Sequence, residues 1–311
     1  MKLGILGTGM IVREFLPWLA GEDSPFTVQA LCSTQRSAPA AAELCEQYHI
    51  PQHTTNYFEL LQWVDVVYLA VPNNQHARYA KVALEAGKHV IVEKPMAVNA
   101  LQAEELACLA RRKKVFLFEA MTTQYLENYN KIRELLPRIG TVKLVQCNFS
   151  QYSSRYDAFC AGETPTSFDP ARAGGALMDL NVYNISYVVG LFGEPNQVHY
   201  TANIERGIDT SGILTMDYNS VRAVCMAART AVLPPGTSSK ARRAIFCRSP
   251  PPTGAAASPS TRTRGGRSIS TSTAASPVRR QSSTPLPAPL RAAIRSCAAG
   301  CWTRRWRSAR C

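Results

Sequence analysis

The residues best placed to do chemistry in this 311-residue chain are Glu93, Lys94 and Pro95, which follow the apolar run His89–Val92. We interpret that run as a short buried strand. In an open α/β sheet, the carboxyl end of a strand faces the crevice in which ligands bind, so a lysine there is a candidate catalytic residue. The alternative is a surface lysine that simply closes a strand, and the tripeptide alone does not distinguish the two.

A glycine turn near the N-terminus offers a binding site for a dinucleotide. Gly7, Thr8 and Gly9 follow the apolar run Lys2–Leu6 and open a predicted helix. Gly7 permits a tight turn, and Gly9 lets the backbone approach a pyrophosphate at the helix N-terminus. The third fingerprint position holds Val12 in place of Gly or Ala, so the motif alone also fits an ordinary strand–helix turn. The predicted cofactor-binding residues of this turn are Gly7, Thr8, Gly9, Met10 and Ile11.

The end of the second predicted strand, Val28–Cys32, indicates which cofactor the turn would hold. Sites that prefer NAD place an acidic residue there for the ribose hydroxyls, and the loop that follows this strand has none. Arg36, together with the hydroxyls of Ser33, Thr34 and Ser37, suits the 2′-phosphate of NADP. We therefore predict NADP, with NAD as the alternative if Arg36 is only a solvated loop charge.

Through residues 1–120, short apolar runs alternate with amphipathic stretches of helical length. Such alternation indicates βαβ units and a parallel sheet. We predict an α/β domain of the Rossmann type, with a doubly wound parallel sheet, over residues 1–120. Strands are expected at Lys2–Leu6, Val28–Cys32, Val64–Ala70, His89–Glu93 and Val115–Glu119, and helices at Ala38–Tyr48, Gln75–Ala86 and Ala100–Arg111.

Residues 121–228 follow a different pattern, in which several strands succeed one another without helices between them. This pattern predicts a C-terminal α+β domain with an open, mostly antiparallel sheet and a helix on one face. Helices are expected at Asn128–Leu136 and Gly174–Phe192, and strands at Thr141–Ser150, Gln197–Ile204, Gly212–Asp217 and Val221–Ala227.

The formal net charge of +13 comes entirely from the C-terminal part of the chain. Residues 229–311 hold 16 of the 35 Lys and Arg residues and none of the 22 Asp and Glu residues. The first 228 residues therefore carry 19 basic and 22 acidic residues, a net charge of −3. The Pro-, Ser- and Arg-rich tail has too few large apolar residues to offset its ordering entropy. We predict that residues 229–311 are disordered, and we expect no nucleic-acid partner.

The change in composition after Ala228 is abrupt and falls inside a strand-like run, where a linker is not expected. Leu233–Ile245 and Gly300–Arg307 can both be back-translated so that the frame one base earlier encodes protein-like strands and a helix. We hypothesise that the residues from about Arg229 onward are out-of-frame translation. The competing interpretation is a real basic tail that binds nucleic acid or an anionic membrane. That interpretation predicts interleaved Lys and aromatic residues, whereas the tail has one Lys, no Tyr and two Trp.

Several other features bear on location and partners. The chain has no run of 18 apolar residues, so we expect no transmembrane span and no membrane partner. The start, Met1–Gly7, lacks the layout of a signal peptide. The ten cysteines lack the paired spacing of a zinc site. We expect a cytoplasmic protein with reduced thiols and no metal.

Three motifs in combination resemble the glucose–fructose oxidoreductase and inositol dehydrogenase family, abbreviated Gfo/Idh/MocA. They are the turn Gly7–Gly9, the run Val71–His76 leading to Ala86–Pro95, and the segment Gly174–Tyr183. Glu119–Met121 is similar to the dihydrodiol-dehydrogenase-like branch, and the resemblance covers about residues 1–228. It implies a hydride transfer between a nicotinamide cofactor and a sugar, polyol or cyclic diol.

The resemblance also implies roles for individual residues. Lys94 looks like the catalytic lysine that contacts the substrate hydroxyl and the nicotinamide ribose. Asp179 and Tyr183 are four residues apart, so we expect them on one helical face. They match the family's catalytic pair of an Asp and a His or Tyr. The resemblance implies that Tyr183 is a proton shuttle beside Lys94. A merely polar helix face is the alternative for these two. The residues implied to line the cofactor crevice are Val71, Pro72, Asn73, His76 and Glu93.

Two departures from the family pattern leave other hypotheses open. Val12 replaces a small residue, and the family's second sheet continues past residue 228, where this chain has its tail. Missing strands would leave an open sheet edge. We expect a homo-oligomer if that sheet is complete, because the family often associates through its open face. The alternatives to an active oxidoreductase are a non-catalytic NADP-binding sensor or regulator, and an inactive frameshifted product.

Overall fold

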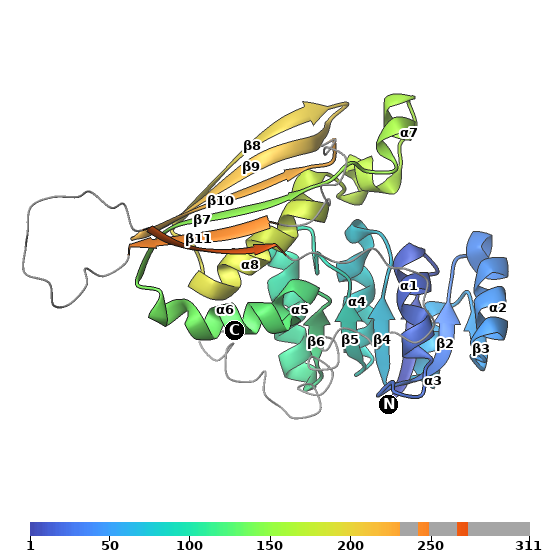
Figure 1. Cartoon of the computed structure of the whole chain (residues 1–311). Coiled ribbons are helices and arrows are strands. Elements are labelled where there is room, and N and C mark those ends of the chain that lie inside the picture. Colours follow the sequence, from blue (N-terminus) through green and yellow to red (C-terminus); the bar gives the residue numbers. More distant parts are fainter. Residues whose placement is uncertain (231–241, 249–265, 273–311) are drawn as a thin grey trace, which may run out of the picture. The chain divides into compact units, whose positions relative to one another are not determined.

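The computed structural model describes residues 1–230, 242–248 and 266–272, which form two compact units (Figure 1). The first unit contains residues 1–122 and 171–173, and the second contains residues 123–170 and the described residues from 174 onward. The short segment Ala171–Ala173 joins the first unit because Asn73 and Asn74 hold it. Their side-chain amides donate hydrogen bonds to the carbonyls of Ala173 and Ala171, at 2.9 Å each.

The first unit is built on a six-stranded sheet in the order β3-β2-β1-β4-β5-β6, in which all neighbouring strands are parallel. In this doubly wound order, ligands bind at the carboxyl ends of the strands where the order reverses, between β1 and β4. The strands are β1 Lys2–Leu6, β2 Thr27–Cys32, β3 Gln52–Thr54, β4 Val66–Leu69, β5 His89–Val92 and β6 Leu117–Glu119. The helices are α1 Met10–Leu19, α2 Ala38–Gln47, α3 Tyr57–Trp63, α4 His76–Glu85 and α5 Ala100–Lys113.

Helices cover both faces of this sheet, and each face has its own apolar core. Leu16 of α1 and Leu44 of α2 are buried in the core on one face. Leu60 of α3, Leu84 of α4 and Leu106 of α5 are buried in the core on the other. The predicted parallel Rossmann architecture is thereby confirmed, and the strand ends that carry the candidate site are fixed from both sides.

The sequence patterns did not predict β3 and α3. β3 has only three residues, and α3 has seven, too few to establish a period. α3 begins at an N-cap, Asn56, whose side chain accepts a hydrogen bond of 3.0 Å from the N–H of Phe58. These short elements form because they extend the sheet edge and cover β2, which is a tertiary effect.

The second unit contains a mixed six-stranded sheet in the order β12-β11-β7-β10-β9-β8. Only β7 and β10 are parallel, and the other neighbours are antiparallel, so the predicted mostly antiparallel sheet is confirmed. Tyr129 and Tyr187 from two helices pack on one face of this sheet. The elements are α6 Glu127–Leu135, β7 Thr141–Ser150, α7 Tyr156–Cys160, α8 Val182–Phe192, β8 Gln197–Glu205, β9 Ile208–Tyr218, β10 Val221–Ala228, β11 Arg242–Arg248 and β12 Gly266–Ser272.

The single helix expected over Gly174–Phe192 is divided in the structure. A π-helical turn, Leu177–Asn181, precedes α8. A π-helical turn is wider than an α-helical one, because its hydrogen bonds run from residue i to i+5. The regular α-helical face that was assumed for Asp179 and Tyr183 is therefore corrected: Asp179 lies on the wide turn and Tyr183 in the first turn of α8.

The expectation that order ends near Ala228 is corrected at two segments. β11 pairs antiparallel with β7, and β12 pairs antiparallel with β11. The edge of β7 offers backbone N–H and C=O groups, which can pair with another strand whatever its side chains. The remainder of the predicted tail lies outside the described residues, and so does Gly300–Arg307, one of the two segments read in another frame.

None of the helices within the described ranges is long and apolar enough to cross a membrane.

Candidate active site

Gly7 and Gly9 shape the turn between β1 and α1. Gly7 has a φ of +119°, and a Cβ at this position would collide with the carbonyl oxygen of Ala70. Gly9 is the N-cap of α1, and a Cβ on it would meet no atom within 4 Å. No side chain caps α1 and its first turn has no acidic residue. The open space and the exposed helix N-terminus together fit a dinucleotide pyrophosphate.

The residues that follow Gly9 divide between surface and core. Met10 is 73% exposed, and Thr8 and Ile11 are half-buried, so all three are accessible beside the turn. Val12 is fully buried in the core between α1 and the sheet. The departure at the third fingerprint position thus falls on a packing residue, not on the surface of the pyrophosphate site.

The loop after β2 is a short 3-10 turn, Gln35–Ser37, and it carries Arg36 on its exposed surface. Thr34 caps the turn: its hydroxyl lies 2.8 Å from the hydroxyl of Ser37. Ser33 is buried, with its hydroxyl 3.1 Å from Nε2 of His53. Of the groups predicted to take a 2′-phosphate, Arg36 and Thr34 are exposed, Ser37 is half-buried and Ser33 is buried. The hydroxyls of Thr34 and Ser37 contact each other within the turn.

The turn after β5 presents Lys94 among carboxylates. The hydroxyl of Tyr68, in β4, donates a hydrogen bond of 2.6 Å to Oε1 of Glu93. The backbone N–H of Lys94 donates to Oε2 of the same carboxyl, at 3.3 Å. On the neighbouring strand β6, Oε1 of Glu119 accepts a hydrogen bond of 2.8 Å from the backbone N–H of Met96. The predicted location of Lys94 at a strand end is confirmed, and two acidic side chains flank it.

Burial and charge act in opposite directions on these carboxyls. Burial raises the pKa of Glu93 above its ordinary value, although the hydrogen bond from Tyr68 and the charge of Lys94 oppose the shift. Burial likewise raises the pKa of Glu119, against the hydrogen bond from Met96 and the charge of Lys94. The charge of Glu119 adds to the rise at Glu93. The two groups and Lys94 thus form one electrostatic cluster.

His76 lies beneath this turn. Its side chain is fully buried, with Nδ1 2.7 Å from the carbonyl oxygen of Pro95 and Nε2 2.8 Å from that of Val71. Burial lowers its pKa. Because both ring nitrogens are engaged with the protein, the expected role of His76 in lining the crevice is corrected: it ties the end of β4 to the turn after β5. Val71, Pro72 and Asn73 above it are half-buried.

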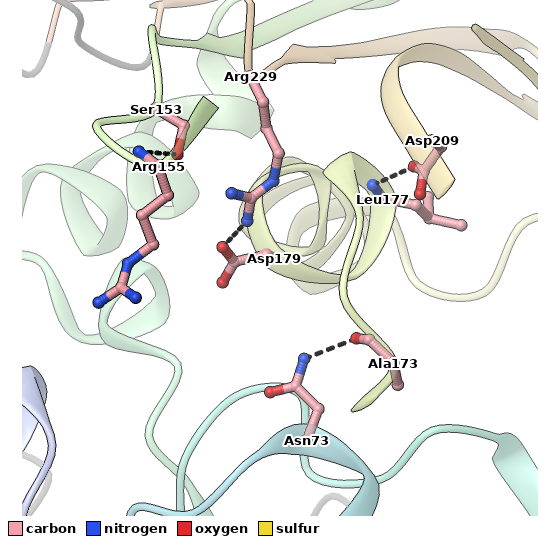
Figure 2. A network of polar contacts seen from close by, with 8 residues as sticks. All are labelled: Asn73, Ser153, Arg155, Ala173, Leu177, Asp179, Asp209 and Arg229. Carbon is pink, nitrogen blue, oxygen red and sulfur yellow. Dashed lines mark hydrogen bonds and ion pairs between the residues drawn. The ribbon is translucent and has the colours of Figure 1, made fainter. Parts of the chain in front are cut away.

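In the second unit, Gly174 and Gly175 bring the chain into the π-helical turn. A Cβ on Gly174 would lie 2.7 Å from the carbonyl oxygen of Ser167. Gly175 has a φ of +101°, and a Cβ there would collide with the carboxylate of Asp209. That carboxylate accepts a hydrogen bond of 2.7 Å from the N–H of Leu177 (Figure 2). Asp209 therefore caps the turn that carries Asp179, with a negative charge at a helix N-terminus.

Asp179 is held by Arg229, whose guanidinium donates a hydrogen bond to the Asp179 carboxylate (Figure 2). The side chain of Arg229 is 4% exposed and that of Asp179 is 32% exposed. Arg229 also lies over the ring of Phe168, 4.9 Å from its centre, and burial lowers its pKa to about 10. Its backbone continues the pattern of β10, because its N–H donates to the carbonyl of Thr210. The ion pair fixes the half-exposed carboxylate at the surface of the second unit.

Tyr183 is half-buried, with its ring edge-on to Phe149 at a centroid distance of 5.3 Å. Two buried amides anchor the helix beneath it. Asn181 donates a hydrogen bond of 3.0 Å to the carbonyl of Cys225, and Asn184 donates one of 3.0 Å to that of Met226. These bonds attach the π-helical turn and α8 to β10, so the orientation of Tyr183 is set by the sheet.

The structure gathers the predicted cofactor residues at the carboxyl ends of β1, β2, β4 and β5, within the first unit. Asp179 and Tyr183 belong to the second unit, and their approach to Lys94 stays a prediction. Within the described part of the chain, no three His, Cys, Asp or Glu side chains come together as metal ligands.

Two family models match the chain. The model described as the oxidoreductase family with an NAD-binding Rossmann fold matches residues 1–121, and the Gfo/Idh/MocA C-terminal domain matches residues 129–242. The chain is also 35% identical, over 229 residues, to the scyllo-inositol 2-dehydrogenase (NADP(+)) IolU of Bacillus subtilis. This match covers 73% of the chain and 69% of IolU. The chain belongs to the Gfo/Idh/MocA family.

Other Gfo/Idh/MocA proteins are similar over the same region. The chain is 34% identical to the oxidoreductase YgjR of Escherichia coli, over 70% of the chain and 66% of YgjR. It is 29% identical to the trans-1,2-dihydrobenzene-1,2-diol dehydrogenase of Mus musculus, over 70% of the chain and 65% of that enzyme. The chain therefore matches about two thirds of the length of these relatives.

Solved structures support the Gfo/Idh/MocA fold. An apo scyllo-inositol dehydrogenase from Lactobacillus casei matches with a TM-score of 0.67 at 18% identity, over 86% of the chain and 75% of that protein. GenD2 from gentamicin A biosynthesis, solved in complex with NAD, also gives a TM-score of 0.67, at 19% identity, over 79% of the chain and 69% of that protein. The predicted family and its NAD-binding Rossmann domain are both confirmed.

Sequence reasoning missed three residues that support the site. Glu119, Asp209 and Arg229 each contact residues that precede them by 23 to 50 positions. Glu119 is the last residue of a predicted strand, and the strand before it along the chain carries Lys94. Its position at that strand end could have indicated that Glu119 belongs to the site. Arg229 was assigned to the tail, and no local pattern marks Asp209.

Proposed function

We propose that this chain is an NADP-dependent oxidoreductase that interconverts an alcohol and a carbonyl group on a sugar, polyol or cyclic diol. The observation that carries the proposal is Lys94, at the carboxyl end of β5 in a Rossmann sheet whose glycine turn leaves a helix N-terminus open. The similarity to IolU and to the mouse diol dehydrogenase supports the substrate class.

The first unit supplies the groups that would bind and orient the cofactor. The backbone at Gly9 and the N-terminus of α1 receive the pyrophosphate. Arg36, on an acid-free exposed loop, pairs with a 2′-phosphate. A bound nicotinamide supplies the hydride chemistry. The ammonium of Lys94 donates a hydrogen bond to the substrate oxygen, which stabilises the negative charge that develops there during reduction.

The second unit supplies the proton partner in this proposal. Tyr183 donates a proton to the substrate oxygen during reduction and accepts it during oxidation. Asp179, oriented by Arg229, accepts a hydrogen bond from a neighbouring substrate hydroxyl. Such a pair of contacts selects substrates that carry adjacent oxygen functions, as polyols and cyclic diols do.

The experiment is a spectrophotometric assay of NADPH oxidation with a panel of sugar, inosose and cyclic ketone substrates, and of NADP⁺ reduction with the matching alcohols. Lys94→Ala is expected to reduce kcat by about a hundredfold or more, with the Kd for NADPH nearly unchanged. Unchanged turnover in Lys94→Ala removes this residue from the mechanism. NADPH binding without turnover of any substrate would favour a sensor.

The cofactor preference has its own test. Arg36→Glu is expected to lower the ratio of kcat/KM for NADPH to that for NADH by about a hundredfold, because the new carboxylate repels a 2′-phosphate and can accept hydrogen bonds from ribose hydroxyls. Arg13→Glu, a charge reversal at another exposed position, is the matched control. Equal effects of the two variants would contradict the assignment of Arg36.

We also infer a homo-oligomer that associates through the outer face of the second sheet, which exposes Leu144 and Ile213. Light scattering on the purified chain measures its mass, and a monomer contradicts the inference.

The expected cytoplasmic location remains part of the proposal and is tested by cell fractionation.

A further inference from the structure

Two acidic side chains lie at the ends of adjacent strands and have no chemical role in the proposed mechanism. Glu93 follows β5, and Glu119 ends β6, where it pairs in register with Val92. Both side chains are shielded enough for burial to raise their pKa. A protein places two such groups together at a desolvation cost, so a compensating interaction is expected.

The contacts of Glu119 surround the turn that carries Lys94. Its Oε1 accepts the N–H of Met96 at 2.8 Å, two residues beyond the lysine. The carbonyl of Pro95 faces Nδ1 of His76 at 2.7 Å. The backbone on the C-terminal side of Lys94 is therefore held from β6 by Glu119 and from α4 by His76.

The titratable groups around this turn come from several elements of the first unit. The charge of Lys94 lowers the pKa of both carboxyls. The charge of Glu119 raises the pKa of Glu93. Tyr68 on β4 donates to the far side of Glu93. At His76 on α4, burial lowers the pKa and the charge of Lys94 adds to that shift, whereas the contacts with the carbonyls of Pro95 and Val71 oppose it. The charge of Lys94 thus acts on the carboxyls of both Glu93 and Glu119.

We propose that Glu119 is a positioning residue, which together with Glu93 forms a carboxyl pair that holds the Lys94 ammonium and its turn in place for catalysis. Glu93 alone could orient Lys94 from the same strand. Glu119 acts from the neighbouring strand, so it fixes the lysine relative to the sheet as well as to its own turn. The proposal rests on the function proposed for Lys94.

The pair makes the position of Lys94 depend on pH. Burial raises the pKa of both carboxyls, and the charge of Glu119 adds to the rise at Glu93, so their protonation extends to higher pH than that of an isolated glutamate. As the pH falls, the pair takes up a proton and its attraction for Lys94 weakens. Activity is therefore expected to decline on the acid side, with a midpoint above the ordinary pKa of a glutamate.

The test is Glu119→Gln, which keeps an oxygen for the Met96 N–H and removes only the charge. We expect kcat to fall roughly ten- to hundredfold, because a misplaced catalytic group loses its alignment, while the Kd for NADPH changes less than about twofold. The acid limb of the kcat profile is expected to move to lower pH, because Glu93 without its neighbour ionises more readily. Glu104→Gln, at an exposed position of α5, is the matched control and should leave kcat and the acid limb of its pH profile unchanged.

A merely structural role of Glu119 would lower activity without moving the acid limb, and an unchanged limb therefore overturns the proposal.

A second readout is independent of turnover. Reductive ¹³C-methylation gives a resonance for Lys94 that Lys94→Arg identifies by its loss. In the wild type this resonance should follow the carboxyl titration, and in Glu119→Gln the inflection should move to lower pH.

The two readouts separate this proposal from the proposed function. If no substrate turns over but the Lys94 resonance shifts as expected, the carboxyl pair stands and the function assigned to Lys94 is wrong. If Lys94→Ala abolishes turnover while neither the acid limb nor the resonance responds to Glu119→Gln, the function stands and the positioning role is overturned.

Discussion

The guanidinium of Arg229 is bonded to the carboxylate of Asp179, fifty residues earlier in the chain, and is itself almost completely buried. The same arginine stacks over Phe168 and continues the backbone pairing beyond β10. The ion pair therefore joins the wide helical turn of the candidate site to the last strand that precedes the basic tail. It places Arg229 in the folded part of the second unit, at the position where the frameshift hypothesis begins the out-of-frame sequence.

Arg229→Leu is expected to lower the free energy of unfolding by about 1–3 kcal/mol, because it leaves the half-exposed Asp179 without its charge partner. The KM for the polyol should rise, while the Kd for NADPH stays constant. Urea unfolding and steady-state kinetics measure these effects. Arg222→Leu removes an exposed ion pair with Asp217 and should cost less than about 0.5 kcal/mol. Equal losses in the two variants would contradict the assignment.

The two glycines of the cofactor turn should respond differently to alanine. Gly7→Ala is expected to destabilise the fold by about 2 kcal/mol or more, since its Cβ meets the Ala70 carbonyl and its φ is positive.

Gly9→Ala should leave stability within about 0.5 kcal/mol but raise the Kd for NADPH at least tenfold, because its Cβ would occupy the space for the pyrophosphate. Thermal unfolding and NADPH fluorescence measure the two effects, and a Gly9→Ala protein that binds NADPH normally would place the cofactor elsewhere.

Arg243, in β11, is a charged residue in an apolar core. It is 6% exposed, its guanidinium lies 4.7 Å from the centre of the Tyr187 ring, and its Nε has no hydrogen-bond partner among the described residues. Burial lowers its pKa. Arg243→Met is expected to raise the free energy of unfolding by about 1 kcal/mol or more, because it removes the desolvation penalty of a buried charge. Arg138→Met, at an exposed position, is the control, and equal stability of wild type and Arg243→Met would show that the charge is compensated.

The hypothesis of a shifted reading frame makes a separate prediction. Among the described residues, the buried Arg243 has no hydrogen-bond partner for its Nε, as expected where a sheet contains residues that did not evolve with it. Resequencing the gene across codon 229 is expected to show a one-base insertion or deletion. The restored frame should extend the match beyond about two thirds of the relatives' length. A continuous frame with no error would reject the hypothesis.

Local sequence was sufficient for much of the fold and for part of the site. Apolar runs ending at polar or glycine residues located β1, β5 and β7, because strand and helix periods are properties of ten or so consecutive residues. Gly7 and Lys94 were found for the same reason, since each lies next to a strand end that the pattern defines. Short elements such as β3 and α3 carry too few residues for a period, so they were missed.

Tertiary structure decided the contacts between distant residues. The burial of His76 between two carbonyls, the capping of the π-helical turn by Asp209 and the pairing of Arg229 with Asp179 each join separate elements. The same holds for Glu119, which reaches Met96 only because β5 and β6 are neighbours in the sheet. The sequence by itself determined which residue stands at each strand end, through local periodicity. The fold decided which charges meet there, because electrostatic partners are chosen by distance in space and not along the chain.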